Sequence, residues 1–292
     1  MTIKRVSERF YLRKRCEQVG VFLPNKIVKQ RGVTLVELVA VIVLLGVIGT
    51  GLVNFIGGSA EAYREVLRRD EVAQVGRFAI ERVSRELRGA LPGSVRVSGN
   101  CVEFVPVLAA SLYTDLPVAG LNTAADSFTV VSAVVPGGAS RVVVYTLDAN
   151  DVYGASAHLR SFDVASASSS AGETTYNFSA PAQQFPEQSP GRRIYFVDTP
   201  VSFCVSGPVT ARVLQRYSGY GYLATQPSPP AGGALLAEFI QLNDAGVIVP
   251  FDYSAGTLQR NAVVQLDFRF LARGTTSEWA RFLQDVVLRG RP

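Results

Sequence analysis

The stretch VTLVELVAVIVLLGVIGTGLVNFI, residues 33–56, contains 24 residues and one charged side chain, that of Glu37. A helix rises about 1.5 Å per residue, so this stretch spans about 36 Å and is long enough to cross a bilayer. The basic residues Lys29 and Arg31 stand just before it and, by the positive-inside rule, keep the N-terminal end in the cytoplasm. The sequence therefore predicts a single-pass membrane protein with its N-terminus in the cytoplasm and everything after Ile56 on the outer side of the membrane.

A cleavable secretory signal is an alternative for this stretch, because Gly58-Ser59-Ala60 offers small residues of the kind that signal peptidase needs. Such a signal has an uncharged apolar region of about 7 to 15 residues. The apolar run here is longer and contains Glu37, whose burial in lipid costs several kcal/mol unless it is paired or lies near the interface. The pattern favours a membrane helix, in which Glu37 is either a tolerated interfacial acid or a residue with a specific partner.

The helix is expected to continue beyond the apolar stretch as an amphipathic stem. From Ala60 to Leu87, apolar residues recur mostly at three- and four-residue spacings, while arginines alternate with acids on the other faces. Gly89, followed by Pro92, ends the pattern. The sequence thus predicts one long helix that is apolar all round in its first half and amphipathic in its second.

Three regions follow from these patterns. Residues 1–32 form a basic leader, residues 33–91 a long helix with a transmembrane half at 33–56, and residues 92–292 a β-rich periplasmic head. The predicted fold class is α+β, with the helix packed on an antiparallel β-sheet. Expected strands lie at 94–98, 101–107, 128–135, 141–147, 194–197, 201–206, 209–217, 235–242, 247–253 and 262–271.

Two segments of the head are expected to be exposed loops between strands. Ala165–Gly172 is rich in serine, and Gln226–Gly233 reads QPSPPAGG. Residues 174–191 show little periodicity and are expected to be irregular.

The distribution of charge excludes nucleic acid as a partner. The 292 residues carry a formal net charge of +5, but residues 1–32 hold nine basic and two acidic side chains. The remainder has 20 basic against 22 acidic residues and no basic run with interleaved aromatics, so it offers no footprint for phosphates.

No catalytic constellation is visible, and the chain is not expected to be an enzyme. His158 is the only histidine, so a catalytic triad or a structural zinc site lacks the residues it needs, and no cofactor or metal is expected. Asp148, Asn150 and Asp151 faintly resemble a calcium loop but lack its glycine and its distal acid, so an Asx-capped turn is favoured.

Three tyrosines of the head lie close together in the sequence. Tyr217, Tyr220 and Tyr222 lie between glycines and indicate a strand with a tight turn rather than an exposed contact patch.

The cysteine count suits an oxidising periplasm. Cys16 lies in the leader, so Cys101 and Cys204 are the two cysteines left in the rest of the chain, an even number. A disulfide across the sheet is expected, and two buried free thiols are the alternative.

The N-terminal residues resemble the class III signal of type IV prepilins. Lys29-Gln30-Arg31-Gly32 is followed by Val33-Thr34-Leu35-Val36-Glu37-Leu38. The resemblance implies that prepilin peptidase cleaves between Gly32 and Val33 and methylates the new N-terminus at Val33, where the family usually has phenylalanine. It also implies that Glu37, then the fifth residue, pairs with the N-terminal ammonium of a neighbouring subunit. Translation from Val28 instead of Met1 would give a compact five-residue leader.

The head resembles the MshO family of minor prepilin-like components of mannose-sensitive haemagglutinin (MSHA) pili. The similar phrases are CVEFVPV at 101–107, VDTPVSFC at 197–204, RYSGYG at 216–221, FDY at 251–253 and NAVVQL at 261–266. PilW-type minor pilins and the J-type pseudopilin of type II secretion are similar too. Members of the MshO family often have a further cysteine near the position of Val249. This chain lacks that cysteine, so a second disulfide is not expected.

The resemblance implies a minor pilin or pseudopilin needed for pilus assembly and surface attachment. Its implied partners are prepilin peptidase, other major and minor pilins, the pilus platform protein and the inner membrane. The alternatives are a minor pseudopilin of type II secretion and a membrane-anchored periplasmic protein that never polymerises.

Overall fold

The structure is a computed structural model of the chain and describes residues 32–131, 141–154, 157–209, 211–242, 249–257, 259–273 and 278–288. The chain forms two compact units, Met1–Ser59 and Ala60–Pro292. In chain order the elements are α1 (Leu35–Arg88), β1 (Arg96–Ser98), β2 (Cys101–Phe104), β3 (Val107–Asp115), β4 (Ser127–Val131), β5 (Arg141–Val143), α2 (Asn150–Tyr153), α3 (Ala157–Arg160), β6 (Ser161–Ser170), β7 (Glu173–Phe178), β8 (Arg193–Val197), β9 (Val201–Ser206), β10 (Val213–Ser218), β11 (Ala234–Glu238), β12 (Ile240–Gln241), β13 (Phe251–Ser254), β14 (Val263–Leu271) and β15 (Trp279–Val287).

The predicted long helix is present as α1. Its apolar part lies in the first unit, where every residue from Gly32 to Ser59 is exposed to solvent. Among the described residues, α1 is the one helix long and apolar enough to cross a membrane. An apolar helix with no protein around it needs another apolar environment, which a bilayer or the packed stems of neighbouring subunits can supply.

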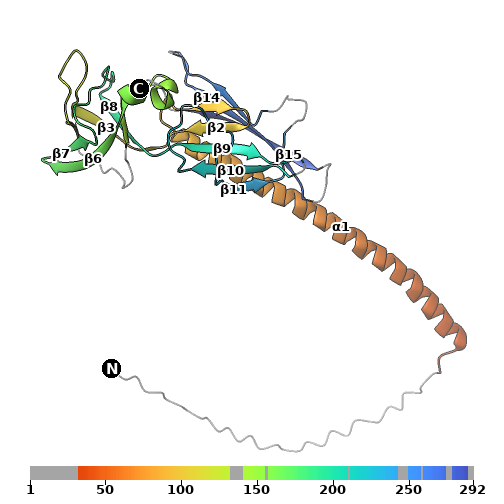
Figure 1. Cartoon of the computed structure of the whole chain (residues 1–292). Coiled ribbons are helices and arrows are strands. Elements are labelled where there is room, and N and C mark those ends of the chain that lie inside the picture. Colours follow the sequence, from red (N-terminus) through yellow and green to blue (C-terminus); the bar gives the residue numbers. More distant parts are fainter. Residues whose placement is uncertain are drawn as a thin grey trace, which may run out of the picture. The chain divides into compact units, whose positions relative to one another are not determined.

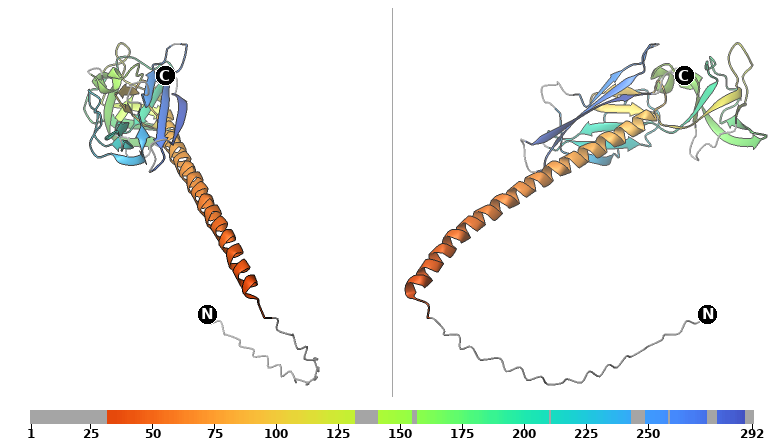
Figure 2. Two further views of the ribbon diagram at one scale, coloured as in Figure 1. Left: turned by 90° about the vertical axis from the view of Figure 1, so that its right-hand side faces the viewer. Right: turned by 180° about the vertical axis from the view of Figure 1, so that it is seen from behind.

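In the second unit, the C-terminal part of α1 packs along two antiparallel sheets (Figure 1). One sheet has the strand order β1-β2-β9-β10-β11, and in the other β14 pairs with β12, β13 and β15. From α1, Val72, Ala79, Val83 and Leu87 are buried in a single hydrophobic core that also contains residues of both sheets. Strands of the two sheets flank this part of the helix in the right-hand view of Figure 2.

Part of the predicted apolar stripe on the stem is not buried within the chain. Tyr63, Leu67 and Phe78 are 64%, 49% and 57% exposed, whereas Val72 is 7% exposed. Within the second unit, burial on α1 therefore begins at Val72.

The second unit also contains a closed barrel of six strands in the order β3-β4-β7-β6-β5-β8. Its neighbouring strands pair antiparallel. Aromatic rings fill the interior, with Phe128 stacked on Tyr176 and Phe162 edge-on to Phe185 at centroid distances of 5.5 and 4.7 Å. Closure pairs the outer strands with each other, so the barrel leaves no open sheet edge.

The α+β class with antiparallel sheets is confirmed, but the expected loop at Ala165–Gly172 is wrong. Most of it belongs to β6, which pairs with β7 from Val164↔Phe178 to Ser170↔Glu173. Its residues are exposed, as expected, but strand pairing needs only backbone groups, and small polar side chains give no hydrophobic alternation to detect. Residues 174–191, which were expected to be irregular, begin within strand β7. The strands β3 and β15 were not predicted from the sequence. Gln226–Gly233 lies outside the strands, as predicted.

Candidate functional site

A hydrogen bond between Glu37 and Thr34 caps the N-terminus of α1. The N–H of Glu37 donates to Thr34 Oγ1 at 3.3 Å, and the N–H of Leu38 donates to the Thr34 carbonyl at 3.1 Å. Thr34 is thus the N-cap and Glu37 the third helical residue, which is the threonine-x-x-glutamate pattern of a capping box. As an acid in the first turn, Glu37 also complements the helix dipole. Sequence reasoning missed this cap, although the pattern is visible in the sequence.

The peptide bond between Gly32 and Val33 lies just outside the helix. Val33 is 70% exposed, and a Cβ built on Gly32 would meet no atom within 4 Å. The bond is therefore accessible to an enzyme without unwinding α1. Lys29 and Arg31, which precede it, lie outside the described residues.

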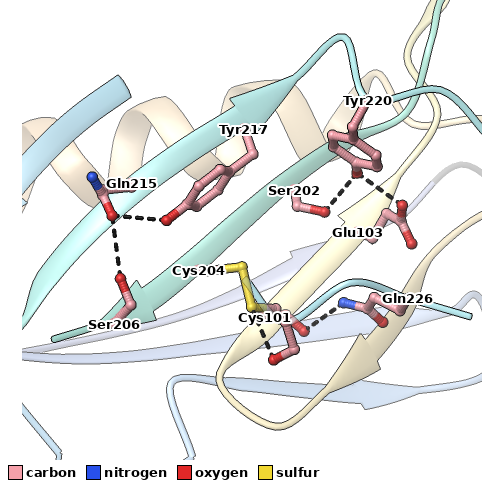
Figure 3. Close-up of a disulfide and its surroundings, with 10 residues drawn as sticks. Cys101, Glu103, Ser202, Cys204, Ser206, Gln215, Tyr217, Tyr220 and Gln226 are labelled. Carbon is pink, nitrogen blue, oxygen red and sulfur yellow. Dashed lines mark hydrogen bonds between the residues drawn. A yellow bond between two sulfur atoms is a disulfide. The ribbon is translucent and has the colours of Figure 1, made fainter. Parts of the chain in front are cut away.

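The second candidate site is the disulfide of the head (Figure 3). Cys101 on β2 and Cys204 on β9 stand directly opposite each other and are bonded, with an S–S distance of 2.06 Å. Both side chains are buried, at 1% and 0% exposure. The pairing follows from the register of two neighbouring strands, which brings together residues 103 positions apart in sequence.

The loop between β10 and β11 covers the disulfide. The Gln226 side-chain amide donates to the Cys101 carbonyl at 3.1 Å, and Ser228 Oγ lies 3.4 Å from Cys101 Sγ. On the neighbouring strand, the Tyr217 hydroxyl donates to Gln215 Oε1 at 2.7 Å (Figure 3). The disulfide is thus sealed from solvent by its own domain.

A buried carboxylate holds the beginning of this loop. Glu103 is fully buried, and its carboxylate accepts hydrogen bonds from Arg96 Nε and, at 2.8 Å, from the Tyr220 hydroxyl. Tyr220 also lies 2.6 Å from Ser202 Oγ (Figure 3). Burial raises the pKa of the Tyr220 hydroxyl far above its ordinary value, and the negative charge of Glu103 adds to this effect. The carboxylate is therefore both charge-paired and hydrogen-bonded, as a buried charge must be.

Arg96 links the same carboxylate to the loop backbone. Its two terminal nitrogens donate to the carbonyls of Ala224 and Leu223 at 2.7 and 2.8 Å. The guanidinium also lies 3.8 Å from the centre of the Tyr153 ring. Sequence reasoning missed this cluster, because Arg96, Glu103 and Tyr220 share no spacing pattern in the sequence.

The three tyrosines do not form an exposed patch. Tyr217 belongs to β10 and is 3% exposed, and Tyr220 and Tyr222 are half-buried. The glycines Gly219 and Gly221 have φ angles of +78° and +76°, which allow the chain to turn after the strand. The strand that the sequence predicts is present up to Ser218, but a loop of residues 219–233 follows it in place of the predicted tight turn.

The acidic turn before α2 forms an Asx turn. Asp148 Oδ1 accepts from the N–H of Asn150 at 2.8 Å and from that of Asp151 at 3.3 Å. Across the described ranges, no group of three histidine, cysteine or acidic residues is placed to hold a metal ion. His158 lies in α3, and its side chain is outside the described residues.

Comparison with protein families gives one match. Residues 27–53 match the family model of the prokaryotic N-terminal methylation motif, and this range contains Gly32, Val33, Thr34 and Glu37. No curated protein and no solved structure matches the chain. The motif supports a type IV prepilin-like protein, which is a structural subunit, and implies processing by prepilin peptidase and assembly with other pilins.

Proposed function

We propose that this chain is a minor pilin of the MshO type, a subunit of an MSHA-type pilus needed for pilus assembly and surface attachment. The observation that carries the proposal is the methylation motif at residues 27–53, placed at the start of an apolar helix that continues into a β-rich head. The resemblance of the head phrases to the MshO family supplies the particular pilus.

Processing is proposed at the Gly32–Val33 bond. Prepilin peptidase would remove residues 1–32 on the cytoplasmic side and methylate the nitrogen of Val33. The exposed, non-helical geometry of this bond suits that reaction, because the helix begins only at Leu35. The mature chain would then consist of the helix and the head.

Assembly is proposed to depend on Glu37. In a filament core, the ammonium of a neighbouring subunit's Val33 would offset the cost of placing the Glu37 carboxylate among apolar helices. The exposed side chains of residues 35–56 and of Tyr63, Leu67 and Phe78 supply apolar surface for neighbouring stems. The platform protein and the other pilins are the proposed partners at this stage.

The head is proposed to fold in the periplasm and to reach the pilus or cell surface. A disulfide between two buried cysteines suits an oxidising compartment. This location agrees with the positive-inside orientation of the basic leader.

Two alternatives share the same anchor and head. One is a minor pseudopilin of type II secretion, and the other is a membrane-anchored periplasmic protein that does not polymerise. The test is a deletion strain, complemented with the wild-type gene, in which surface filaments and the secretion of a type II substrate are both measured. Loss of filaments with normal secretion supports the proposal. Loss of secretion alone indicates a pseudopilin, and no change in either indicates the unpolymerised anchor.

A further inference from the structure

β15 is a long strand with one unpaired side. It pairs with β14 in an unbroken antiparallel register over nine residues, from Trp279↔Leu271 to Val287↔Val263. Within the part of the chain that the structure describes, β15 pairs with no other strand. The opposite side of this strand is therefore a sheet edge with free backbone groups.

The register identifies which backbone groups face that edge. At the two ends of the ladder, the N–H of Ala272 donates to the Glu278 carbonyl and the N–H of Leu288 donates to the Ala262 carbonyl, each at 2.9 Å. Hydrogen-bonded pairs alternate along an antiparallel ladder, so the even-numbered residues of β15 bond to β14. The odd-numbered residues, 279 to 287, direct their N–H and C=O groups toward the open edge.

This edge lacks the features that usually prevent strand pairing. Its sequence, WARFLQDVV, contains neither proline nor lysine, and the register shows no bulge. The outward side chains include Trp279, Leu283 and Val287, which are 52%, 57% and 54% exposed. An unbroken edge of nine residues without proline, lysine or a bulge is a surface for adding a further strand.

β15 runs along the stem in the same direction as α1. Glu278 Oε1 lies 4.0 Å from Arg69. Farther along both elements, the Phe282 ring lies against Gly76, and the Ser84 hydroxyl donates to Gln284 Oε1 at 3.0 Å. A strand added to β15 would therefore run along the axis of the stem.

The direction of β15 along the stem decides between a second copy and a different partner. Arg281 and Asp285 lie two residues on either side of Leu283. Antiparallel pairing of two copies about Leu283 would place each arginine opposite an aspartate, but their stems would then point in opposite directions. A two-fold pair with parallel stems would set the identical backbone groups of the two edges at the same height, N–H against N–H and C=O against C=O, so no hydrogen-bonded ladder forms. A symmetric pair of copies anchored in one membrane therefore fits this edge badly.

We propose that the open edge of β15 binds a strand of a different pilin-like subunit anchored in the same membrane. This proposal rests on the proposed function, which supplies neighbours with parallel stems. The partner strand has apolar side chains at alternate positions to cover Trp279, Leu283 and Val287. Arg281 is already held by Asp267, at 2.8 and 2.6 Å, so the partner needs no acid opposite it. Asp285 accepts a hydrogen bond from Gln265 Nε2 at 3.2 Å, and a basic residue of the partner opposite it would add a charge pair.

The test places a photo-crosslinking phenylalanine analogue at Trp279 in the full-length chain, in cells that make the filaments. Two further changes are made in that background, Leu283→Pro and Leu283→Thr. Proline removes the N–H that faces the edge and leaves the bonds to β14 intact, and threonine removes apolar surface but keeps the N–H. We expect a crosslink to another protein with a prepilin methylation motif. Its yield should fall about tenfold with proline and much less with threonine, because a lost hydrogen bond adds to a steric clash.

Two controls separate the possible failures. The analogue at Leu121, which is 65% exposed and lies away from β15 in the sequence, should give no crosslink to a pilin. A product of twice the chain's own mass, equal yields from the two Leu283 variants, or no product in cells with normal filaments would overturn the proposal. If the wild-type chain is not found in filaments at all, the proposed function fails instead. The melting temperatures of the purified Leu283 variants are compared, to show that both fold.

Discussion

The ring of Phe282 lies against the backbone of Gly76, so close that a Cβ at position 76 would stand 2.1 Å from Phe282 Cε2. Gly76 is in the interior of α1 and Phe282 is in the middle of β15. A glycine in the middle of a helix ordinarily costs stability, so its presence here has a packing reason. The missing side chain is what allows the second sheet to reach the stem.

Gly76→Ala should destabilise the head although alanine favours helix more than glycine does. We expect a loss of about 1 to 3 kcal/mol in the free energy of unfolding, because the methyl group overlaps an aromatic ring. Urea unfolding of the purified protein measures it. Gly58→Ala is the matched control, since a Cβ there would meet no atom within 4 Å, and it should be neutral or stabilising. Equal effects of the two substitutions would contradict this packing.

Processing predicts the mass of the mature chain. Mass spectrometry of the wild-type protein should find an N-terminus at N-methylated Val33. Gly32→Val should leave the precursor uncut, because a side chain at the residue before the bond obstructs the peptidase. Val33→Phe, which introduces the residue usual in the prepilin family, should still be cleaved. An intact leader on the wild-type protein in filament-forming cells would refute the prepilin assignment.

Substitution can separate the charge of Glu37 from the hydrogen-bonding capacity of its side chain. Glutamine can complete a capping box as glutamate does, but it carries no charge. If pairing with a neighbour's ammonium is needed, Glu37→Gln and Glu37→Val should both insert into the membrane and both assemble poorly. Incorporation into filaments is measured at matched membrane levels. Normal assembly of Glu37→Gln with poor assembly of Glu37→Val would show that assembly needs a hydrogen-bonding side chain at position 37 and not its charge.

The disulfide predicts the thiol content of the mature protein, from which Cys16 would be absent. Unfolded without reductant, the protein should show no reactive thiol, and after reduction it should show two. In the chain-entropy model, the bond between Cys101 and Cys204 stabilises the fold by roughly 4 to 5 kcal/mol. The double substitution to serine should therefore lower the urea midpoint strongly. Two reactive thiols before reduction would show that the bond does not form.

The buried tyrosine predicts loss of stability at high pH. Because burial raises the pKa of Tyr220 above its value in the unfolded chain, the unfolded state releases the proton first. The free energy of unfolding should be unaffected by this group below about pH 10 and should fall as the pH rises above it. Tyr220→Phe should reduce that slope and, at neutral pH, cost about 1 kcal/mol for the lost hydrogen bond to Glu103. Tyr63→Phe, at an exposed position of α1, is the control, and an unchanged slope in Tyr220→Phe would contradict the assignment.

The N-terminal half of the architecture could be predicted from the sequence, because its signals are local. A long apolar run, a single acid at Glu37 and a helix-ending Gly89 each act within a few turns of one helix, so they define α1 without knowledge of the rest. The same holds for the stronger strands, whose apolar residues alternate, and for the Asx turn at Asp148. Local patterns of this kind depend only on neighbours in the chain.

Only the tertiary structure shows the features that depend on contacts between residues far apart in the sequence. The small polar residues of β6 from Ser166 to Ser170 form a strand because β7 supplies their backbone partners, and no local sequence pattern shows that pairing. The reason for a glycine at position 76 is the ring of Phe282, more than 200 residues away. The burial of Glu103 is likewise explained only by its hydrogen bonds with Arg96 and Tyr220. The open edge of β15 is likewise visible only once β14 is in place, because an edge is defined by the strand that is missing beside it.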